Sequence, residues 1–414
     1  MGLSNTPASE RVHIGFFGLM NVGKSSLINA VTAQELSLVS EIPGTTTDPV
    51  HKTMEILPLG PVVITDTAGI NDSGTLGEMR AARAKKVLDQ TDIAVLVTEA
   101  GRELCPAEEE LIALFREKGI DFVIVRNKAD LLGAGEHGVT EAKGTDSDPA
   151  DAKAPVSELY VSARTGVGVH ELKECLASFA KEWDSKRQLL VADLLSPEDI
   201  TMLVIPIDES APKGRLILPE QQVMRELLDH HMSFFTCQPE EIPGALAALS
   251  RKPALVITDS QAFERVNALV PEEIALTSFS ILLARYKGSL QTMVEGANVL
   301  AQLKDGDRVL ICEGCTHHRQ CNDIGTVKLP GWIRQFSGAK PAFDFTSGHG
   351  FPEAEDLGTY RLIVHCGGCM LNEQEMKSRI KAAKAAGVPI VNYGMAIAKM
   401  HGILERSLEP FKRT

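Results

Sequence analysis

The sequence Gly18-Leu19-Met20-Asn21-Val22-Gly23-Lys24-Ser25 decides the fold of the first part of this chain. It fits the pattern G-x-x-x-x-G-K-[ST], follows an apolar run at 12–17, and opens a helical segment at Ser26. Glycines let the backbone N–H groups of such a loop surround phosphates, and the helix N-terminus adds a favourable dipole. We therefore predict a nucleotide site in which Lys24 contacts the β- and γ-phosphates and the Ser25 hydroxyl binds Mg²⁺. The other residues expected to line this site are Gly18, Asn21, Val22, Gly23 and Ser26.

The region around this loop has the pattern of an α/β domain. From residue 10 to about 183, apolar strands alternate with amphipathic helices, which predicts a mostly parallel sheet flanked by helices. The segment Asp66-Thr67-Ala68-Gly69 follows the apolar run at 62–65. We expect Asp66 to contact Mg²⁺ through water and the Gly69 N–H to contact the γ-phosphate.

The segment Asn127-Lys128-Ala129-Asp130 follows the apolar run at 122–125 and predicts recognition of guanine. It resembles the Asn-Lys-x-Asp sequence with which small GTPases bind the base. The Asp130 carboxylate can accept two hydrogen bonds from the guanine edge, which adenine cannot donate. Ser162-Ala163 follows a further apolar run at 159–161 and resembles the segment whose backbone N–H contacts the guanine carbonyl. The nucleotide is therefore expected to be GTP.

The segment Gly44-Thr45-Thr46-Thr47-Asp48 lies where a nucleotide-sensing switch is expected. It resembles the Gly-Thr-Thr-x-Asp of the tRNA-modification and Era-like GTPases. The resemblance implies that Thr45 contacts GTP and that Thr46 completes the Mg²⁺ shell. It also implies slow, K⁺-stimulated hydrolysis, in which Asn21 helps to bind K⁺ and Glu78 positions the attacking water. Glu78 is equally well explained as a solvated carboxylate at a helix start. The expected catalytic residues are Lys24, Thr46 and Glu78.

Five of the eight cysteines crowd between residues 312 and 369. The segments Cys315-Thr316-His317 and His365-Cys366-Gly367-Gly368-Cys369 each follow a short apolar run, which indicates a buried strand. Thiolate-bearing loops at the ends of neighbouring strands can share one metal site, either a [4Fe–4S] cluster or a tetrahedral Zn²⁺. Because the chain is large and shows no export signal, the crowding favours metal binding over disulfides. Cys312 is interpreted as a core residue, and the alternative is that it binds zinc together with Cys315. Cys321 is unassigned.

A phosphate-loop GTPase followed by this spacing of cysteines and histidines resembles HydF, the family of maturation GTPases of [FeFe]-hydrogenase. Segments 313–319 and 323–327 and the three-part layout carry the same resemblance. It implies a [4Fe–4S] cluster on Cys315, Cys366 and Cys369, with His317, another side chain or water at the fourth iron site. It further implies a scaffold that carries a transient diiron precursor, built by two radical-SAM maturases, to the hydrogenase catalytic subunit. We expect His365 to orient its neighbour, with metal ligation as the alternative.

These patterns predict an α/β protein of three domains. The first is a phosphate-loop GTPase domain with a mostly parallel sheet at 8–185. The second is a small α/β dimerisation domain at 190–270. It carries no recognisable catalytic or metal-binding motif, and we expect it to form a homodimer. The third is an α/β iron–sulfur cluster domain at 275–414, expected to begin with a long helical stretch at 277–303. The segment 133–158, rich in Ala, Gly, Asp and Pro, is expected to form a surface loop.

The net charge and the hydropathy indicate which partners and which compartment to expect for the protein. The formal net charge of −13 argues against a general affinity for nucleic acid or for anionic membranes. No apolar stretch reaches the roughly 18 residues that a membrane-spanning helix needs. The first residues lack the basic and apolar regions of a secretory signal. We expect a cytoplasmic protein with no nucleic-acid and no membrane partner.

Two other functions stay open at this point. An Era-like GTPase with a zinc module would act in RNA modification or ribosome assembly, but the acidic charge and the lack of a basic, aromatic-rich C-terminal stretch weigh against it. A redox enzyme that uses the cluster for electron transfer lacks a dinucleotide fingerprint, because no G-x-G-x-x-G follows a strand. The iron, sulfide and zinc contents of the protein separate these functions.

Overall fold

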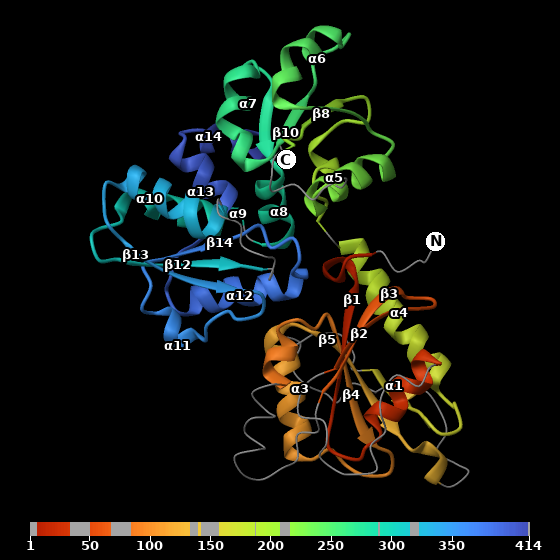
Figure 1. Ribbon diagram of the computed structural model, residues 1–414. Coiled ribbons are helices and arrows are strands. Elements are labelled where there is room, and N and C mark those ends of the chain that lie inside the picture. The colour runs from red at the N-terminus through yellow and green to blue at the C-terminus, as the bar shows by residue number, and fades with distance from the viewer. Residues whose placement is uncertain are drawn as a thin grey trace. The chain divides into compact units, whose positions relative to one another are not determined.

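The computed structural model describes residues 6–33, 50–67, 84–132, 140–141, 157–186, 188–207, 216–288, 290–314 and 323–412. The chain divides into two compact units, Met1–Arg187 and Gln188–Thr414. Both units are α/β, and helices and strands alternate through each of them (Figure 1). Within the described ranges, no helix has the length and apolarity to cross a membrane.

The first unit is built on a seven-stranded sheet with the order β2-β3-β1-β4-β5-β7-β6. The strands from β3 to β7 are parallel, and β2 and β6 run antiparallel at the two edges. This confirms the predicted mostly parallel sheet. The strands are β1 (Val12–Phe17), β2 (Val50–Ile56), β3 (Gly60–Asp66), β4 (Ile93–Glu99), β5 (Asp121–Asn127), β6 (Thr140–Glu141) and β7 (Ser157–Tyr160), and the helices are α1 (Lys24–Thr32), α3 (Pro106–Lys118) and α4 (Val169–Lys186).

Helices cover both faces of this sheet because successive strand side chains point to opposite sides. Phe17 of β1 packs with Leu111 and Phe115 of α3 on one face. Phe16 packs on the other face, in the core that contains Leu172 of α4 and the buried side chains of α1. The loops at the carboxyl ends of the parallel strands are where α/β sheets bind their ligands. The expected surface loop at 133–158 lies outside the described residues, apart from β6 and the start of β7.

The second unit contains two four-stranded sheets, and every strand pair in both of them is parallel. The order in the first of these sheets, called the second sheet here, is β11-β10-β8-β9. Its strands are β8 (Ile200–Val204), β9 (Ser233–Cys237), β10 (Leu255–Thr258) and β11 (Ala275–Ser278), and its helices are α5 (Leu218–Asp229), α6 (Ile242–Ala248), α7 (Phe263–Leu269) and α8 (Phe279–Lys287).

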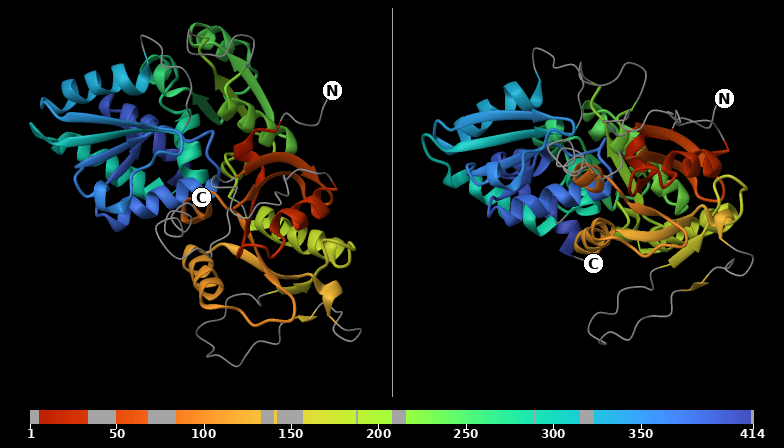
Figure 2. Two further views of the ribbon diagram at one scale, coloured as in Figure 1. Left: turned by 60° about the horizontal axis from the view of Figure 1, so that its bottom comes forward. Right: turned by 90° about the horizontal axis from the view of Figure 1, so that it is seen from below.

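The third sheet has the order β13-β12-β14-β15 and helices on both faces, as the two further views also show (Figure 2). Helices α11 and α12 lie on one face, and α9, α10 and α13 lie on the other (Figure 1). A π-helical turn at Ile324–Lys328 precedes α10. The strands are β12 (Arg308–Glu313), β13 (Ala342–Ser347), β14 (Leu362–His365) and β15 (Ile390–Asn392), and the helices are α9 (Leu290–Val299), α10 (Leu329–Ser337), α11 (Ala354–Leu357), α12 (Glu373–Ala385), α13 (Tyr393–Met400) and α14 (Leu404–Leu408).

The expectation of one long helix at 277–303 was wrong: the segment begins with the end of β11 and then forms two helices, α8 and α9, followed by a 3-10 turn at Leu300–Gln302. Thr277 and Ser278 end β11, where they pair with Ile257 and Thr258 of β10. β11 is only four residues long, and its last three, Leu276, Thr277 and Ser278, are all buried, so the sequence shows no apolar–polar alternation that would identify a strand. The second sheet therefore reaches Ser278, past residue 270, while the domain borders that we proposed stay predictions.

The C-terminal helix ties the two sheets of this unit together. The Arg406 guanidinium on α14 donates to the carbonyl oxygens of Pro271 at 2.6 Å and Ile274 at 3.1 Å, just before β11. It also donates to the side-chain oxygen of Asn267 at 2.8 Å. Charge-assisted hydrogen bonds of this kind are stronger than neutral ones. The second and third sheets also share one buried core, which contains Val256 of β10 and Val309 of β12, and they belong to one compact unit.

Candidate nucleotide and metal sites

The phosphate loop lies between β1 and α1 with its backbone in conformations that favour glycine. Gly18 and Gly23 have φ of 144° and 90°, and Asn21 has a φ of 61°, in the left-handed region that Asn tolerates. A Cβ atom on Gly23 would lie 2.4 Å from the side-chain nitrogen of Asn127. Glycine at position 23 therefore serves both the backbone conformation and the close approach of Asn127.

Asn127 links the phosphate loop to the segments that we expect to bind guanine. Its side-chain nitrogen donates to the Val22 carbonyl at 2.9 Å, and its side-chain oxygen accepts from the Ala163 N–H at 3.1 Å. Ser162 donates to an Asp130 carboxylate oxygen at 2.6 Å, and this hydrogen bond lowers the pKa of Asp130. Asp130 is consequently held as a carboxylate, the form that accepts hydrogen bonds from a guanine edge.

Lys24 and the Ser25–Asp66 pair lie at the phosphate end of the site. The Lys24 ammonium donates to the carbonyl oxygens of Gly18 at 3.1 Å and Leu19 at 2.7 Å, and burial lowers its pKa to about 8. Ser25 Oγ donates to a carboxylate oxygen of Asp66 at 2.7 Å, and burial raises the pKa of Asp66. Hydroxyl and carboxylate oxygens are hard ligands, so this pair fits the Mg²⁺ that a GTPase domain implies.

The structure thus brings together most of the residues that we expected around the nucleotide. Gly18, Asn21, Val22, Gly23, Lys24, Ser25 and Ser26 follow β1, Asp66 ends β3, Asn127, Lys128 and Asp130 follow β5, and Ser162 and Ala163 follow β7. The Lys128 ammonium contacts the carboxylate of Glu99 at 3.1 Å, on the neighbouring β4. Thr45, Thr46, Gly69 and Glu78 lie outside the described residues, and their roles stay predictions.

The two cysteine segments follow β12 and β14, which are neighbours in the third sheet. Cys312 pairs with His365 across these strands, and the Cys366 N–H donates to the Cys312 carbonyl at 2.8 Å. Cys366 Sγ accepts from the Gly314 N–H at 3.0 Å and from the Gly368 N–H at 3.4 Å. Hydrogen bonds to sulfur are typical of cysteines that hold iron–sulfur clusters, where they tune the reduction potential.

His365 is fully buried, and both of its ring nitrogens have partners. Nδ1 lies 2.7 Å from the Cys366 carbonyl oxygen, and Nε2 lies 2.9 Å from an Arg379 guanidinium nitrogen. Nδ1 therefore carries the proton and Nε2 accepts. Burial lowers the pKa of His365 to about 4, so the ring is neutral at pH 7. The Arg379 guanidinium in turn donates to the Gly348 carbonyl and the Glu375 carboxylate, both at 2.6 Å. This network fixes the backbone of Cys366, in keeping with the orienting role that we expected for His365.

The other cysteines differ in position. Cys312 is fully buried in the apolar core of the second unit, and burial raises the pKa of its thiol. Cys237 is buried at the end of β9, and burial raises the pKa of its thiol to about 11. Burial also raises the pKa of the Cys369 thiol, so the pKa direction does not separate the expected ligands from the other cysteines. Cys315, His317 and Cys321 lie outside the described residues, so the ligand set of Cys315, Cys366, Cys369 and His317 stays a prediction.

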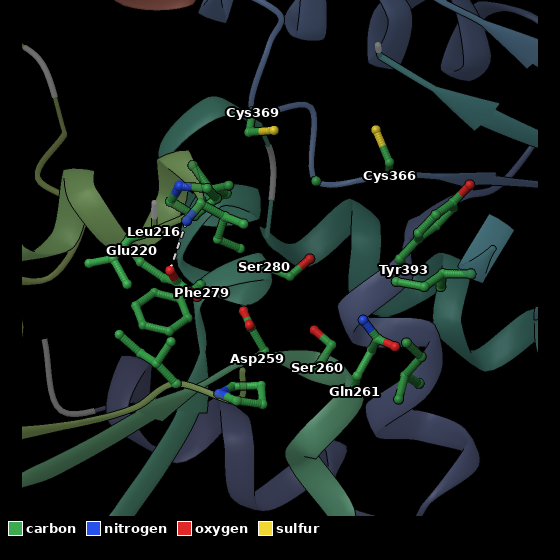
Figure 3. Close-up of a pocket in the computed structure, with 18 of the residues that line it drawn as sticks. Leu216, Glu220, Asp259, Ser260, Gln261, Phe279, Ser280, Cys366, Cys369 and Tyr393 are labelled. Carbon is green, nitrogen blue, oxygen red and sulfur yellow. Dashed lines mark hydrogen bonds between the residues drawn. The ribbon is translucent and has the colours of Figure 1, made fainter. Parts of the chain in front are cut away.

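Cys366 and Cys369 line a cavity of about 330 Å³ between the second and third sheets (Figure 3). The two cysteines lie on one side of it, and Asp259, Ser260 and Gln261 lie on the other. The described residues that line it include Phe279 and other apolar side chains but neither Lys nor Arg. Such a site suits a compact ligand better than a phosphate-bearing one, because phosphates are usually bound by basic residues.

Two hydroxyl groups in this cavity have unused hydrogen-bonding capacity. Ser260 Oγ and Tyr393 Oη are buried, and neither has a hydrogen-bond partner among the described residues. Ser280 also lines the cavity, near Ser260 and on the side of Cys369 (Figure 3). Buried polar groups without a partner are uncommon and call for an explanation such as a bound ligand. Sequence reasoning missed these residues because Ser and Tyr carry no motif and come from separate segments.

Three domain families match this chain. A family described as 50S ribosome-binding GTPase matches residues 13–128. The hydrogen maturase F dimerization domain matches residues 190–288, and the hydrogen maturase F tetramerization domain matches residues 291–410. The first match contains the phosphate loop and reaches Lys128, and the third contains both cysteine segments.

Several GTPases are similar to part of the chain. The tRNA modification GTPase MnmE of Desulfotalea psychrophila is 38% identical over 160 residues, which cover 38% of this chain and 32% of that protein. GTPase Der of Campylobacter fetus subsp. fetus is 34% identical over 212 residues, which cover 50% of this chain and 45% of that protein. The chain therefore spans less than half the length of these relatives. A crystal structure of Aquifex aeolicus Era bound to GDP and aluminium fluoride has 23% identity and a TM-score of 0.34, and the match covers 40% of this chain and 56% of that one.

The relatives place the first domain among the phosphate-loop GTPases, and the two maturase domains account for the chain beyond residue 190. The fold agrees with this division, because one α/β sheet carries the phosphate loop and two further parallel sheets follow it. The chain belongs to the hydrogen maturase F (HydF) family of GTPases, which is implicated in hydrogenase maturation.

Proposed function

We propose that this GTPase is a scaffold and carrier in the assembly of [FeFe]-hydrogenase. It holds a [4Fe–4S] cluster on Cys315, Cys366 and Cys369, receives a diiron precursor from radical-SAM maturases, and delivers it to the hydrogenase catalytic subunit. GTP hydrolysis governs the exchange of these partners. The observation that supports this proposal best is the hydrogen bond from the Gly314 N–H to Cys366 Sγ.

That hydrogen bond supports a shared metal because Gly314 is the residue directly before Cys315 in the sequence. It lies at the end of β12, beside the loop that contains Cys366 and Cys369. Thiolate sulfurs with N–H donors around them fit an iron–sulfur cluster, and three cysteines fill three corners of a [4Fe–4S] cube. When bound, the cluster supplies an iron site at which further ligands exchange.

The cavity beside Cys366 and Cys369 supports a role as carrier. It has room for a compact metal complex, and apolar side chains such as Phe279 and Leu283 exclude water from part of it. Ser260 and Tyr393 offer hydroxyl donors that nothing among the described residues uses. A precursor with small, hydrogen-bond-accepting ligands would satisfy both hydroxyls. We place the diiron precursor in this cavity.

The nucleotide is proposed to act as a switch. A ligand shifts a conformational equilibrium only by the difference in its affinity for the two states. GTP and GDP differ in their contacts with the segments around Thr46 and Gly69, so hydrolysis changes which state is favoured. Turnover is expected to be slow and K⁺-stimulated, with K⁺ held through Asn21 and the water positioned by Glu78. The maturase and hydrogenase partners would then bind one nucleotide state better than the other.

The metal content of the protein tests this proposal. Protein purified without oxygen would be analysed for iron, sulfide and zinc, with an absorption spectrum recorded before and after reduction. We expect about four iron and four sulfide ions per chain and a spectrum that bleaches on reduction. One zinc ion per chain without sulfide would contradict the cluster, and the carrier role with it.

A further inference from the structure

Lys287 is a buried lysine whose ammonium faces the loop that contains two of the expected cluster ligands. It ends α8, and the residue is only 1% exposed. Its Nζ donates to the carbonyl oxygens of Leu371 at 2.7 Å, Gly368 at 3.1 Å and Cys369 at 3.4 Å. A lysine ammonium has three N–H donors and no acceptor, so three carbonyl oxygens from one loop match its capacity.

These contacts set the direction of the peptide groups in the loop. The Gly368 N–H points to Cys366 Sγ, while the Gly368 carbonyl accepts from Lys287 and from the Leu371 N–H. Gly368 has a φ of 65°, in the left-handed region that favours glycine. The loop thus turns the Gly368 N–H toward a sulfur and the carbonyl groups of Gly368, Cys369 and Leu371 toward a cation.

Lys287 also connects two domains. It belongs to the segment matched by the dimerization domain, whereas the loop that it contacts belongs to the segment matched by the tetramerization domain. Placing a lysine ammonium in a protein interior is unfavourable unless hydrogen bonds or charges compensate it. The loop carbonyls supply such compensation only while α8 stays against the loop. These hydrogen bonds therefore link the position of α8 to that of the Cys366–Cys369 loop.

We propose that Lys287 is a positioning residue for the cluster. It holds the Cys366–Cys369 loop in a ligand-ready conformation and places a positive charge beside the bound cluster. A nearby cation stabilises the reduced, more negative form of a cluster and so raises its reduction potential. This inference rests on the proposed [4Fe–4S] cluster and adds a residue of the second domain to the site.

The test compares anaerobically reconstituted wild-type protein with Lys287→Met and Lys287→Gln. Methionine removes the charge and the donors, whereas glutamine removes the charge and keeps a side-chain amide donor. The control is Lys252→Met, because Lys252 is exposed and pairs with Glu273 away from the loop. The readouts are the midpoint potential of the cluster, the rate at which a chelator removes its iron, and GTP hydrolysis.

We expect a lower midpoint potential in both Lys287 variants and faster removal of iron by the chelator in Lys287→Met, because losing a contact that orients a metal ligand weakens metal binding, typically by ~10–100-fold. GTP hydrolysis and the Lys252→Met protein should match the wild type. If Lys287→Met aggregates, the midpoint potential of the cluster in Lys287→Gln is the test of this inference. A wild-type potential and chelation rate in the Lys287 variants would overturn this inference alone. If the wild-type protein binds no cluster, both the proposed function and this inference are wrong.

Discussion

The backbone N–H of Gly314 lies 3.0 Å from the sulfur of Cys366 and donates a hydrogen bond to it. The contact joins two segments that lie far apart in the sequence but follow neighbouring strands. Since β12 and β14 are parallel and paired in register, both strands deliver the residues after them to the same edge of the sheet. Gly314 is the residue directly before Cys315 in the sequence. The fold therefore brings the start of the first cysteine segment to the loop that contains Cys366.

The first prediction concerns Cys366. We expect Cys366→Ser to lose the cluster and to keep GTP hydrolysis within about twofold of the wild type. The reason is that the nucleotide residues lie in the unit Met1–Arg187, which has its own cores, whereas Cys366 lies in the other unit. Iron and sulfide per chain and the rate of phosphate release are the measurements.

The matched control is Cys312→Ala, on the strand beside Cys366. Cys312 is buried in an apolar core, so alanine should cost stability but leave the iron content unchanged. Loss of iron in Cys312→Ala would make Cys312 part of the metal site. Loss of both iron and GTP hydrolysis in Cys366→Ser would show that the two units depend on each other.

The sequence sufficed for the α/β class, for the phosphate-loop domain and for membership of the HydF family. Those inferences rest on local signals: Gly23 and Lys24 lie in a contiguous motif, and apolar runs mark the strands that precede each motif. Such motifs can be recognised without knowledge of the tertiary structure, because one short segment supplies both the residue types and the backbone conformation.

The remaining site residues could not be read from the sequence. Lys287, Arg379 and Tyr393 belong to separate helices, and only the packing of these helices brings them to the cysteine loop. A lysine at a helix end looks like an ordinary surface residue, yet Lys287 is buried against three carbonyls. The same limit explains why β11 was predicted as the start of a helix. Its last three residues are all buried, so apolar and polar residues do not alternate along it as they do in a half-exposed strand.

The second prediction concerns the hydroxyls in the cavity. We expect Tyr393→Phe and Ser260→Ala to bind the [4Fe–4S] cluster normally but to bind a diiron complex less tightly. Each hydrogen bond is worth about 0.5–1.5 kcal/mol, so affinity should fall about 2- to 13-fold per variant. The measurement is iron retained above the cluster content after gel filtration with a synthetic diiron complex that carries hydrogen-bond-accepting ligands.

Thr277→Val is the matched control for these two variants. The Thr277 hydroxyl is also buried without a hydrogen-bond partner among the described residues, but Thr277 does not line the cavity. Its removal should leave the binding of the diiron complex unchanged. Equal retention of the complex by wild type, Tyr393→Phe and Ser260→Ala would place the precursor elsewhere.

The third prediction concerns pH and follows from Lys24. Burial lowers the pKa of its ammonium from 10.5 to about 8 in the nucleotide-free protein. Phosphate groups stabilise the charged form, so GTP binding takes up a proton above pH 8. The affinity for GTP should therefore fall as pH rises above 8, by up to about tenfold per pH unit for one linked proton.

The same pKa shift affects folding in the opposite direction. Between pH 8 and 10.5 the unfolded chain binds more protons at Lys24 than the folded one, so this residue alone makes the nucleotide-free fold more stable as pH rises. GTP titrations between pH 7 and 9.5 test the binding effect, with Lys24→Arg as a control whose side chain does not titrate there. An affinity that stays constant over this range in the wild type would contradict the prediction.

The fourth prediction concerns K⁺ and Asn21. Asn21 has a φ of 61°, so Asn21→Gly removes the side-chain amide without backbone strain, whereas alanine would add strain. We expect wild-type hydrolysis to be faster in K⁺ than in Na⁺ and the Asn21→Gly protein to show equal rates in both, with GTP affinity nearly unchanged. Persistent K⁺ stimulation in Asn21→Gly would assign the cation to other ligands.

The last prediction concerns self-association through β9. This strand is at the edge of the second sheet, within the segment matched by the dimerization domain, and Phe235 on it is 38% exposed. The Cys237 carbonyl accepts from the Ile205 N–H, so Cys237 points toward the sheet and, by alternation, the N–H of Thr236 points outward. Unpaired outward N–H groups on an edge strand can pair with a second copy of the strand.

Thr236→Pro removes that outward donor and leaves the pairing with β8 intact, because proline is tolerated on the free side of an edge strand. We expect it to form smaller assemblies of the 44.7 kDa chain in light scattering than the wild type, whereas Thr236→Val, which keeps the N–H, associates like the wild type. If Thr236→Pro folds and associates like the wild type, the copies meet through another surface. If both variants dissociate, the Thr236 side chain and not its N–H makes the contact.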